Sequence, residues 1–307
     1  GIMRIAIMGA GGVGGYFGAF LGEAGNDVTF IARGAHLEAM RRDGLRLMGA
    51  RGDIHLSPTQ ATDDPATVGP VDIVLFAVKL FATETAAAAI RPLVGPRTAV
   101  ISLMNGVDGP ERMAAILGEA AVLPGAAYVS ALITHPGEIT YTSDMSSIVF
   151  GEYAGGASAR GEAFAEICRA AGFDAKVSAD ARADLWNKFV LLATNSALTA
   201  GIRKPAGEIY SDPDLQALAR AMMEEVVAVG RAKGIALDPE IVEKSVAMTQ
   251  SFPPGMYASM YHDLNQGKPM ELDSLSGYVR REGLRLGVPT PHHATVWGLL
   301  KPYRDGA

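Results

Sequence analysis

The stretch that decides the fold is an apolar run that ends in closely spaced glycines: Arg4-Ile5-Ala6-Ile7-Met8-Gly9-Ala10-Gly11-Gly12-Val13-Gly14-Gly15. The apolar run has strand character, and a segment of helical character rich in Ala, Gly and Leu follows over residues 12–24. A strand, a glycine turn and a helix N-terminus in this order are typical of a site for the pyrophosphate of a dinucleotide. We therefore expect residues 9–14 to contact a cofactor: Gly9, Ala10, Gly11, Gly12, Val13 and Gly14.

The three glycines of this G-x-G-x-x-G motif have different expected roles. Gly9 permits the tight turn, Gly11 lets the backbone approach the phosphates, and Gly14 lets the helix pack closely on the strand. With 36 glycines in 307 residues the motif alone is a weak signal. Its position between a strand and a helix makes it a strong one.

The end of the next strand predicts which dinucleotide binds. Residues 27–32 form the strand, and the chain continues as Arg33-Gly34 without an acidic residue at the tip. An NAD site usually places Asp or Glu there to accept hydrogen bonds from the ribose 2′-hydroxyl. Arg33 instead suits a 2′-phosphate, with His36 as a second contact, although a solvated arginine is the alternative. We expect NADP rather than NAD.

The composition is that of a packed globular protein. Of its residues 49% are hydrophobic and 20% are charged. A length of 307 residues is enough for two domains. A net charge of −6 without a basic tract argues against a nucleic-acid partner. Cys168 is the only cysteine, which excludes an intrachain disulfide and a thiolate metal cluster. Apolar runs too short for a membrane span, and Met3 directly before a strand, lead us to expect a cytoplasmic protein without a membrane partner.

The first half of the chain alternates strand and helix patterns. Strands are predicted at residues 71–78, 99–103 and 121–123, and helices at 83–93 and 110–117. This repetition predicts an α/β domain with a doubly wound parallel sheet of the Rossmann type. Residues 140–142 and 147–150 are predicted as antiparallel strands that extend the same sheet.

From Ser178 onward the pattern predicts only helices, at residues 180–201, 213–233, 239–250, 256–266, 270–286 and 291–303. Asp212-Pro213 forms a typical helix start, and Gly234 a typical stop. We predict a dinucleotide-binding domain at residues 1–178 and an all-helical substrate and dimerisation domain at 179–307. The active site is expected in the cleft between them. The apolar helices could form a homodimer face or a single domain core.

Hydride transfer to a carbonyl needs a proton donor, and two lysines are candidates. Lys79 follows the buried strand at 71–78, at the sheet edge where ligands of such folds bind. Lys188 lies in an otherwise apolar helix, with Leu192 and Asn195 on the same side. Each lysine alone is more often a solvated cation. Asn105, at the end of another strand, could contact cofactor or substrate or simply form an Asn-Gly turn.

Polar residues in the second half complete the set of candidates. Glu271 is expected at the start of an amphipathic helix. The alternative to a functional role is that its negative charge only complements the helix dipole. Ser259 and Asp263 lie one turn apart on the preceding helix, and Asp273 follows Glu271. The histidines have no metal-ligand spacing, so no metal is expected.

Taken together, these motifs resemble the ketopantoate reductase (2-dehydropantoate 2-reductase) family of the 6-phosphogluconate-dehydrogenase-like group. The resemblance spans nearly the whole chain. It rests on the following segments: residues 9–14, Ile31-Ala32-Arg33-Gly34, Ala77-Val78-Lys79, Met104-Asn105-Gly106-Val107, Leu185-Trp186-Asn187-Lys188-Phe189, Ser259-Met260 with Asp263, and Glu271-Leu272-Asp273.

The resemblance implies that NADPH reduces ketopantoate to pantoate in pantothenate biosynthesis. It assigns protonation of the carbonyl to Lys188 and orientation of that lysine and the substrate hydroxyl to Glu271. Ser259 would bind the substrate carboxylate. Lys79 and Asn105 would lie between cofactor and substrate, and Arg33 would hold the 2′-phosphate.

The chain departs from the family pattern at two places. Leu192 stands where the family usually has a substrate-binding asparagine, and Leu275-Ser276-Gly277 replaces a more frequent apolar-Asn-Gly. With leucine at position 192, the site lacks one hydrogen-bond partner for the substrate hydroxyl, which relaxes its specificity for a hydroxylated substrate. Asn195 lies on the same side of the helix and could replace that partner. We therefore keep a more apolar 2-oxo acid as an alternative substrate.

Two other functions fit part of the sequence. A 3-hydroxy-acid dehydrogenase shares the architecture, but the missing acid after the second strand and the pairing of Lys188 with Glu271 argue against it. A dinucleotide-sensing regulatory protein has no need for the set of polar residues that the resemblance brings together.

Overall fold

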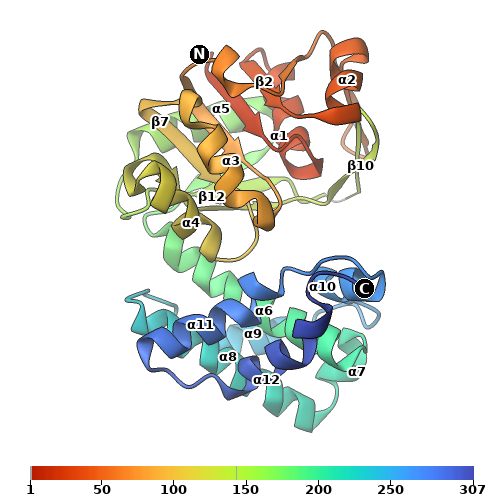
Figure 1. The fold of residues 1–307 in the computed structure, drawn as a ribbon, viewed down its shortest axis with the longest axis vertical. Coiled ribbons are helices and arrows are strands. Elements are labelled where there is room, and N and C mark those ends of the chain that lie inside the picture. The colour runs from red at the N-terminus through yellow and green to blue at the C-terminus, as the bar shows by residue number, and fades with distance from the viewer. Residues whose placement is uncertain (1, 143) are drawn as a thin grey trace. The chain divides into compact units, whose positions relative to one another are not determined.

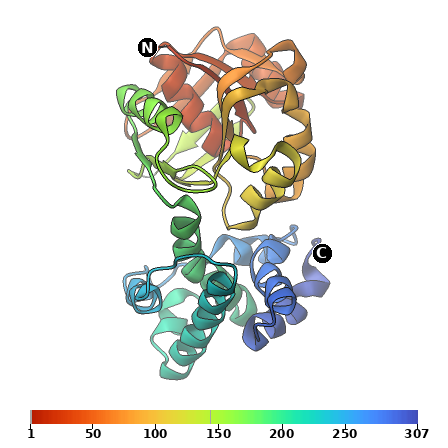
Figure 2. The same cartoon turned by 90° about the vertical axis from the view of Figure 1, so that its left-hand side faces the viewer.

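The computed structural model describes residues 2–142 and 144–307. The chain divides into two compact units. The first comprises the residues up to Asn105 and then Gly109–Arg182, and the second comprises Gly106–Asp108 and Ala183–Ala307. In Figures 1 and 2 the first unit runs from red to green and the second mainly from green to blue.

A six-stranded parallel sheet organises the first unit, with the strand order β5-β2-β1-β6-β7-β8. The strands are β1 (Arg4–Met8), β2 (Asp27–Ile31), β5 (Gln60–Thr62), β6 (Val71–Phe76), β7 (Val94–Ser102) and β8 (Val122–Leu123). The predicted doubly wound α/β fold is confirmed.

Helices cover both faces of this sheet, because alternate side chains of each strand point to opposite faces. Ile5 and Ile7 of β1 belong to one core cluster together with Phe17. Ala6, between them, belongs to the other cluster with Ala87. The helices of this part of the chain are α1 (Gly12–Glu23), α2 (Gly34–Asp43), α3 (Thr83–Ala89), α4 (Asp108–Leu117) and α5 (Ala159–Ala171), with 3₁₀ turns η1 (Pro65–Thr67), η2 (Leu80–Ala82), η3 (Arg91–Leu93) and η4 (Glu119–Ala121).

Two smaller sheets accompany the main one, in the orders β10-β11-β3-β4 and β13-β12-β9. Their strands are β3 (Leu45–Gly49), β4 (Ile54–Leu56), β9 (Gly125–Tyr128), β10 (Ala131–His135), β11 (Glu138–Tyr141), β12 (Ser147–Phe150) and β13 (Asp174–Val177). The prediction that residues 140–142 and 147–150 extend the main sheet is wrong. The first pairs with β10 and, in parallel, with β3, while β12 pairs with β9 and, in parallel, with β13. Local alternation identifies a strand, but distant packing chooses its partner.

The second unit is helical, as predicted. Asp212 caps α8 by accepting hydrogen bonds from the N–H groups of Asp214 and Leu215, and Gly234 follows its end with φ +83°. Both predicted helix signals are therefore confirmed. The elements are α6 (Ala181–Ile202), α7 (Ala206–Tyr210), α8 (Pro213–Ala232), α9 (Ile241–Thr249), α10 (Ser259–Asn265), η5 (Leu272–Ser274), α11 (Ser276–Leu286), α12 (Pro291–Leu300) and η6 (Lys301–Tyr303). Within the described residues, none of these helices or those of the first unit combines the length and apolarity needed to cross a bilayer.

Candidate active site

The turn between β1 and α1 requires glycine for steric reasons. Gly9 has φ +89°, and a Cβ on it would lie 2.6 Å from the carbonyl oxygen of Ala77. A Cβ on Gly14 would lie 2.2 Å from the carbonyl oxygen of Gly9. Because real Cβ atoms do not approach so closely, both positions exclude a side chain.

The space in front of α1 fits an anionic group. A Cβ on Gly11 would meet no described heavy atom within 4 Å, so it would project into open space. Gly11 is also the N-cap of α1, where the structure gives no side-chain cap, and the first turn contains no acid. The N–H groups of the helix start are therefore left for a ligand, and their partial positive charge suits a pyrophosphate.

Arg33 is exposed at the end of β2, as the N-cap of α2. In the part of the chain that the structure describes, its guanidinium forms no hydrogen bond or ion pair, so it is available to a phosphate. His36 differs from its predicted role as a second phosphate contact. Its two ring nitrogens lie 2.8 Å from the carbonyl oxygen of Ala10 and 2.8 Å from the backbone nitrogen of Gly137.

Lys79 and Asn105 are exposed just beyond the ends of the neighbouring strands β6 and β7. The two strands are parallel, with Phe76 opposite Ser102 near their carboxyl ends. Ala77 donates a backbone hydrogen bond to Met8 at the end of β1. The first unit thus brings Lys79, Asn105 and the glycine turn to one edge of the sheet, where ligands of such folds bind.

Lys188 lies on α6 between two buried aromatic residues. Trp186 and Phe189 have ring centroids 5.4 Å apart, and both contact the ring of Tyr278 on α11. The packing of these three rings fixes the rotation of α6 about its axis, and therefore the direction in which the Lys188 side chain leaves the helix. Burial lowers the pKa of Lys188 because the charged ammonium is partly removed from water.

The neighbours of Lys188 on α6 have distinct environments. Asn187 accepts a hydrogen bond from the backbone N–H of Asp238 and so has a structural contact. Leu192 is partly exposed one turn after Lys188. Asn195, which the sequence places to compensate for Leu192, is only 6% exposed, and its side-chain oxygen accepts a hydrogen bond from Tyr210 at 2.6 Å. That bond ties α6 to α7 inside the helical unit.

Ser259 is the exposed first residue of α10, whose N-terminus lies beside α6. The contact with α6 is a hydrogen bond from the backbone N–H of Ala258 to the hydroxyl of Thr199, near the C-terminus of α6, at 3.2 Å. Asp263, one turn later on α10, is partly exposed. The second unit therefore brings Ser259 to the helix that carries Lys188.

Glu271 is exposed, but it does not begin an amphipathic α-helix as predicted. It precedes the 3₁₀ turn η5, and α11 begins only at Ser276 because Leu275 has non-helical dihedrals of φ −111° and ψ −110°. The turn is anchored at Ser274, whose hydroxyl donates to Asp108 Oδ2 at 3.0 Å. Asp273 is also structural, since its carboxylate accepts hydrogen bonds from Trp297 and Arg304.

Ser276, the second departure from the family pattern, has a structural environment. It is fully buried, and its hydroxyl lies 3.0 Å from Nδ1 of His293. His293 Nε2 lies 3.0 Å from the carbonyl oxygen of Met222. A carbonyl only accepts, so Nε2 carries the proton and Nδ1 accepts from Ser276. Burial lowers the pKa of His293, which keeps the ring neutral.

Replacement of Ser276 by alanine should therefore affect stability and not substrate affinity. Nδ1 of His293 would lose its only described side-chain donor, at a cost of about 1–2 kcal/mol. We expect a lower melting temperature and an unchanged KM for the substrate. A raised KM without loss of thermal stability would contradict this assignment.

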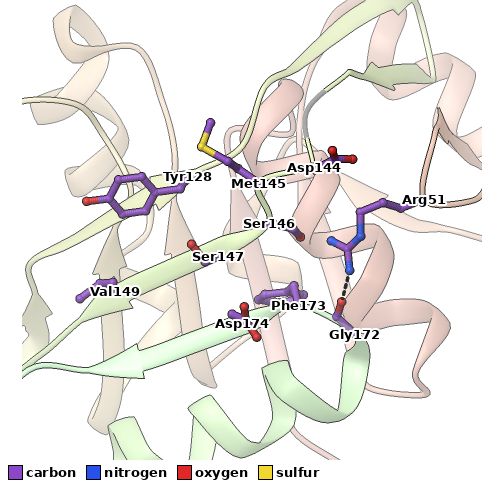
Figure 3. A pocket seen from close by; sticks show the side chains of 10 residues that line it. All are labelled: Arg51, Tyr128, Asp144, Met145, Ser146, Ser147, Val149, Gly172, Phe173 and Asp174. Carbon is purple, nitrogen blue, oxygen red and sulfur yellow. Dashed lines mark hydrogen bonds between the residues drawn. The ribbon is translucent and has the colours of Figure 1, made fainter. Parts of the chain in front are cut away.

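Two surface cavities are lined by none of the site residues that the sequence predicts. The larger has a volume of about 690 Å³ and is drawn in Figure 3, where the guanidinium of Arg51 bonds the carbonyl of Gly172. Arg51, Tyr128, Met145 and Phe173 are among its lining residues. The smaller, of about 390 Å³, is lined by residues that include Arg46, His55 and Glu138. The described residues contain no cluster of three or more His, Cys, Asp or Glu arranged for a metal ion.

Comparisons with known proteins agree over nearly the whole chain. The family model "Ketopantoate reductase PanE/ApbA" matches residues 5–155, and the model of its C-terminal part matches residues 180–304. A 2-dehydropantoate 2-reductase of Mesorhizobium japonicum is 32% identical, covering 97% of each chain. An uncharacterized oxidoreductase of Bacillus subtilis, YkpB, is 29% identical over 98% of this chain and 99% of that one. The crystal structure of a PanE/ApbA family ketopantoate reductase from Ralstonia eutropha superposes with a TM-score of 0.88, at 32% identity and 98% coverage of both chains.

Proposed function

Since the chain belongs to the ketopantoate reductase family, we propose that it uses NADPH to reduce 2-dehydropantoate (ketopantoate) to pantoate, a step toward pantothenate. Membership makes the chain an oxidoreductase that acts on CH–OH groups with a nicotinamide dinucleotide. The observation that carries the proposal is the family match over residues 5–155 and 180–304, and the partly buried amine of Lys188 on α6 supports it. Such an amine can give up a proton readily to a developing alkoxide.

The proposed mechanism assigns the proton transfer to Lys188. When bound, NADPH would supply the hydride to the carbonyl carbon and would itself be oxidised to NADP⁺. As the C=O bond becomes C–O, Lys188 donates a proton from Nζ to the oxygen, and the product is the 2-hydroxy acid. Until the proton has moved, the positive charge of the ammonium stabilises the negative charge that grows on the oxygen. Glu271 orients Lys188 and accepts a hydrogen bond from the substrate hydroxyl.

The remaining assignments concern binding. Ser259, at the exposed start of α10, donates a hydrogen bond to the substrate carboxylate. Lys79 and Asn105, at the carboxyl edge of the sheet, contact cofactor and substrate. The glycine turn at residues 9–14 binds the pyrophosphate, and Arg33 binds the 2′-phosphate.

The first test is turnover by the purified protein. Loss of the absorbance of reduced nicotinamide is followed with ketopantoate and with a panel of 2-oxo acids that lack its hydroxyl, each with NADPH and with NADH. We expect turnover with NADPH and a 2-oxo acid. Dinucleotide binding without turnover of any 2-oxo acid would instead support a sensing protein.

Leu192 supports a second candidate substrate, a more apolar 2-oxo acid. This residue is partly exposed one helical turn after Lys188 and offers no partner for a substrate hydroxyl. Replacement of Leu192 by asparagine is expected to raise kcat/KM for ketopantoate about tenfold, the effect of one added hydrogen bond of ~1.4 kcal/mol.

The matched control is Leu299→Asn, since Leu299 is 67% exposed on α12, a helix that carries none of the proposed site residues. This control is expected to leave kcat/KM for ketopantoate unchanged. If Leu192→Asn brings no gain, Leu192 does not limit the use of ketopantoate.

A further inference from the structure

His36 joins three segments of the first unit through its imidazole ring. It is the third residue of α2, and its Nε2 lies 2.8 Å from the carbonyl oxygen of Ala10. The backbone N–H of Gly137, in the turn between β10 and β11, donates to Nδ1 at 2.8 Å. Since a peptide N–H can only donate, Nδ1 carries no proton, and in the neutral ring the proton is on Nε2. Nε2–H therefore donates to the Ala10 carbonyl.

The accepting carbonyl belongs to the glycine turn itself. Ala10 lies between Gly9 and Gly11 and is only 4% exposed. On one side the chain is attached directly before the turn, where the backbone N–H of Ala77 donates to the carbonyl of Met8 at 2.9 Å. His36 supplies a second attachment, from α2. The two together leave the turn little freedom to change its backbone angles.

The segment that carries His36 also carries Arg33. The residues between them include Gly34, whose φ of +64° places the chain in a tight turn before the helix proceeds. Arg33 is three residues before His36 and has an exposed guanidinium. The His36–Ala10 bond thus joins the segment with the basic residue directly to the turn at the N-terminus of α1.

We propose that His36 is a positioning residue of the dinucleotide site, which holds the Arg33 segment and the glycine turn at a fixed separation. This inference rests on the proposed binding of NADPH. NADPH has two anionic anchors, the 2′-phosphate at Arg33 and the pyrophosphate at the turn. When the two subsites are held at the correct separation, binding at one makes binding at the other nearly intramolecular. NADH lacks the 2′-phosphate, so it gains much less from a fixed separation.

Two substitutions separate the two bonds of His36. In His36→Asn the side-chain amide replaces Nδ1, so it can still accept from Gly137 but cannot reach Ala10. In His36→Gln the longer amide can donate to the Ala10 carbonyl in place of Nε2. The matched control is His55→Asn. Nε2 of His55 also bonds a backbone carbonyl, that of Asp43 at 2.7 Å, but this carbonyl lies outside the glycine turn.

The measurement is calorimetric titration of each variant with NADPH and with NADH, together with thermal melts. We expect His36→Asn to raise Kd for NADPH about fivefold and for NADH at most about twofold, as fits the loss of one positioning hydrogen bond. His36→Gln should lie within about twofold of the wild type for both, and His55→Asn should match the wild type. At saturating NADPH, kcat of His36→Asn should stay within about twofold.

Three results would overturn the inference alone: unchanged NADPH affinity in His36→Asn, equal weakening of NADPH and NADH, or a loss in His36→Gln as large as that in His36→Asn. A wild-type protein that binds neither dinucleotide would overturn the proposed function and this inference with it.

Discussion

Replacement of Lys188 by methionine is expected to lower kcat for 2-oxo acid reduction about a thousandfold, while Kd for NADPH stays within about twofold. Methionine keeps the length and apolar stem of the side chain but removes both the proton and the positive charge. General acid catalysis typically contributes about 10²–10⁴-fold, and electrostatic stabilisation of the oxyanion adds to it. The measurement is steady-state turnover at saturating NADPH and a titration of NADPH binding.

The matched control is Lys204→Met. Lys204 follows α6, is largely exposed, and lies 4.0 Å from Glu208 in a surface pair that contributes little to stability. This variant is expected to keep wild-type kcat. A loss of less than tenfold in Lys188→Met would exclude Lys188 as the proton donor.

The pH dependence of the wild type provides an independent test of Lys188. A general acid must be protonated, so the rate of reduction is constant at low pH and falls as pH rises through the pKa of the donor. Because burial lowers the pKa of Lys188, this fall should occur below the usual range for lysine. In Lys188→Arg, whose guanidinium stays charged, the fall should disappear from this range. The same fall in both proteins would assign the titration to another group.

Replacement of Arg33 by alanine is expected to raise Kd for NADPH about 30-fold and to leave Kd for NADH within about twofold. The change removes charge-assisted hydrogen bonds to the 2′-phosphate, which are worth about 1.5–3 kcal/mol. Because the Arg33 side chain has no partner within the described protein, its loss leaves no internal group unsatisfied. The measurement is the ratio of the two dissociation constants.

Arg42→Ala is the matched control for Arg33. Arg42 is also exposed and lies on the same helix, but near its C-terminus, where it pairs with Asp43. It should leave both dissociation constants unchanged. If Arg33→Ala weakens NADPH and NADH equally, Arg33 does not recognise the 2′-phosphate.

Much of the first unit could be predicted from local sequence. The run from Arg4 to Gly15 contains a whole strand, turn and helix start, and its steric requirements involve mostly its own atoms, such as Gly14 against Gly9. The helix signals at Asp212 and Gly234 are likewise local. Strand pairing outside the main sheet could not be predicted from local sequence, because β11 pairs with β3, a strand from far earlier in the chain.

For the candidate site too, some residue positions could be predicted from the sequence, whereas the contacts of other residues could not. The sequence predicts Lys79 and Asn105 at one edge of the sheet, because parallel strands end together. It predicts Lys188 as a cation in an apolar helix, but the contacts of the neighbouring polar residues could not be predicted. Asn195, which the sequence places to compensate for Leu192, bonds Tyr210 instead. Ser276, one of the departures from the family pattern, bonds His293.

The sequence by itself determined the α/β sheet, the helical second half, the glycine turn and the basic residue that follows β2. These features depend on hydrogen bonds and periodicities within one element or between consecutive elements. Only the tertiary structure decided which polar side chains are already bonded. His36 shows the reason: its partners Ala10 and Gly137 lie on separate segments, and a long-range hydrogen bond has no local periodicity by which to find it.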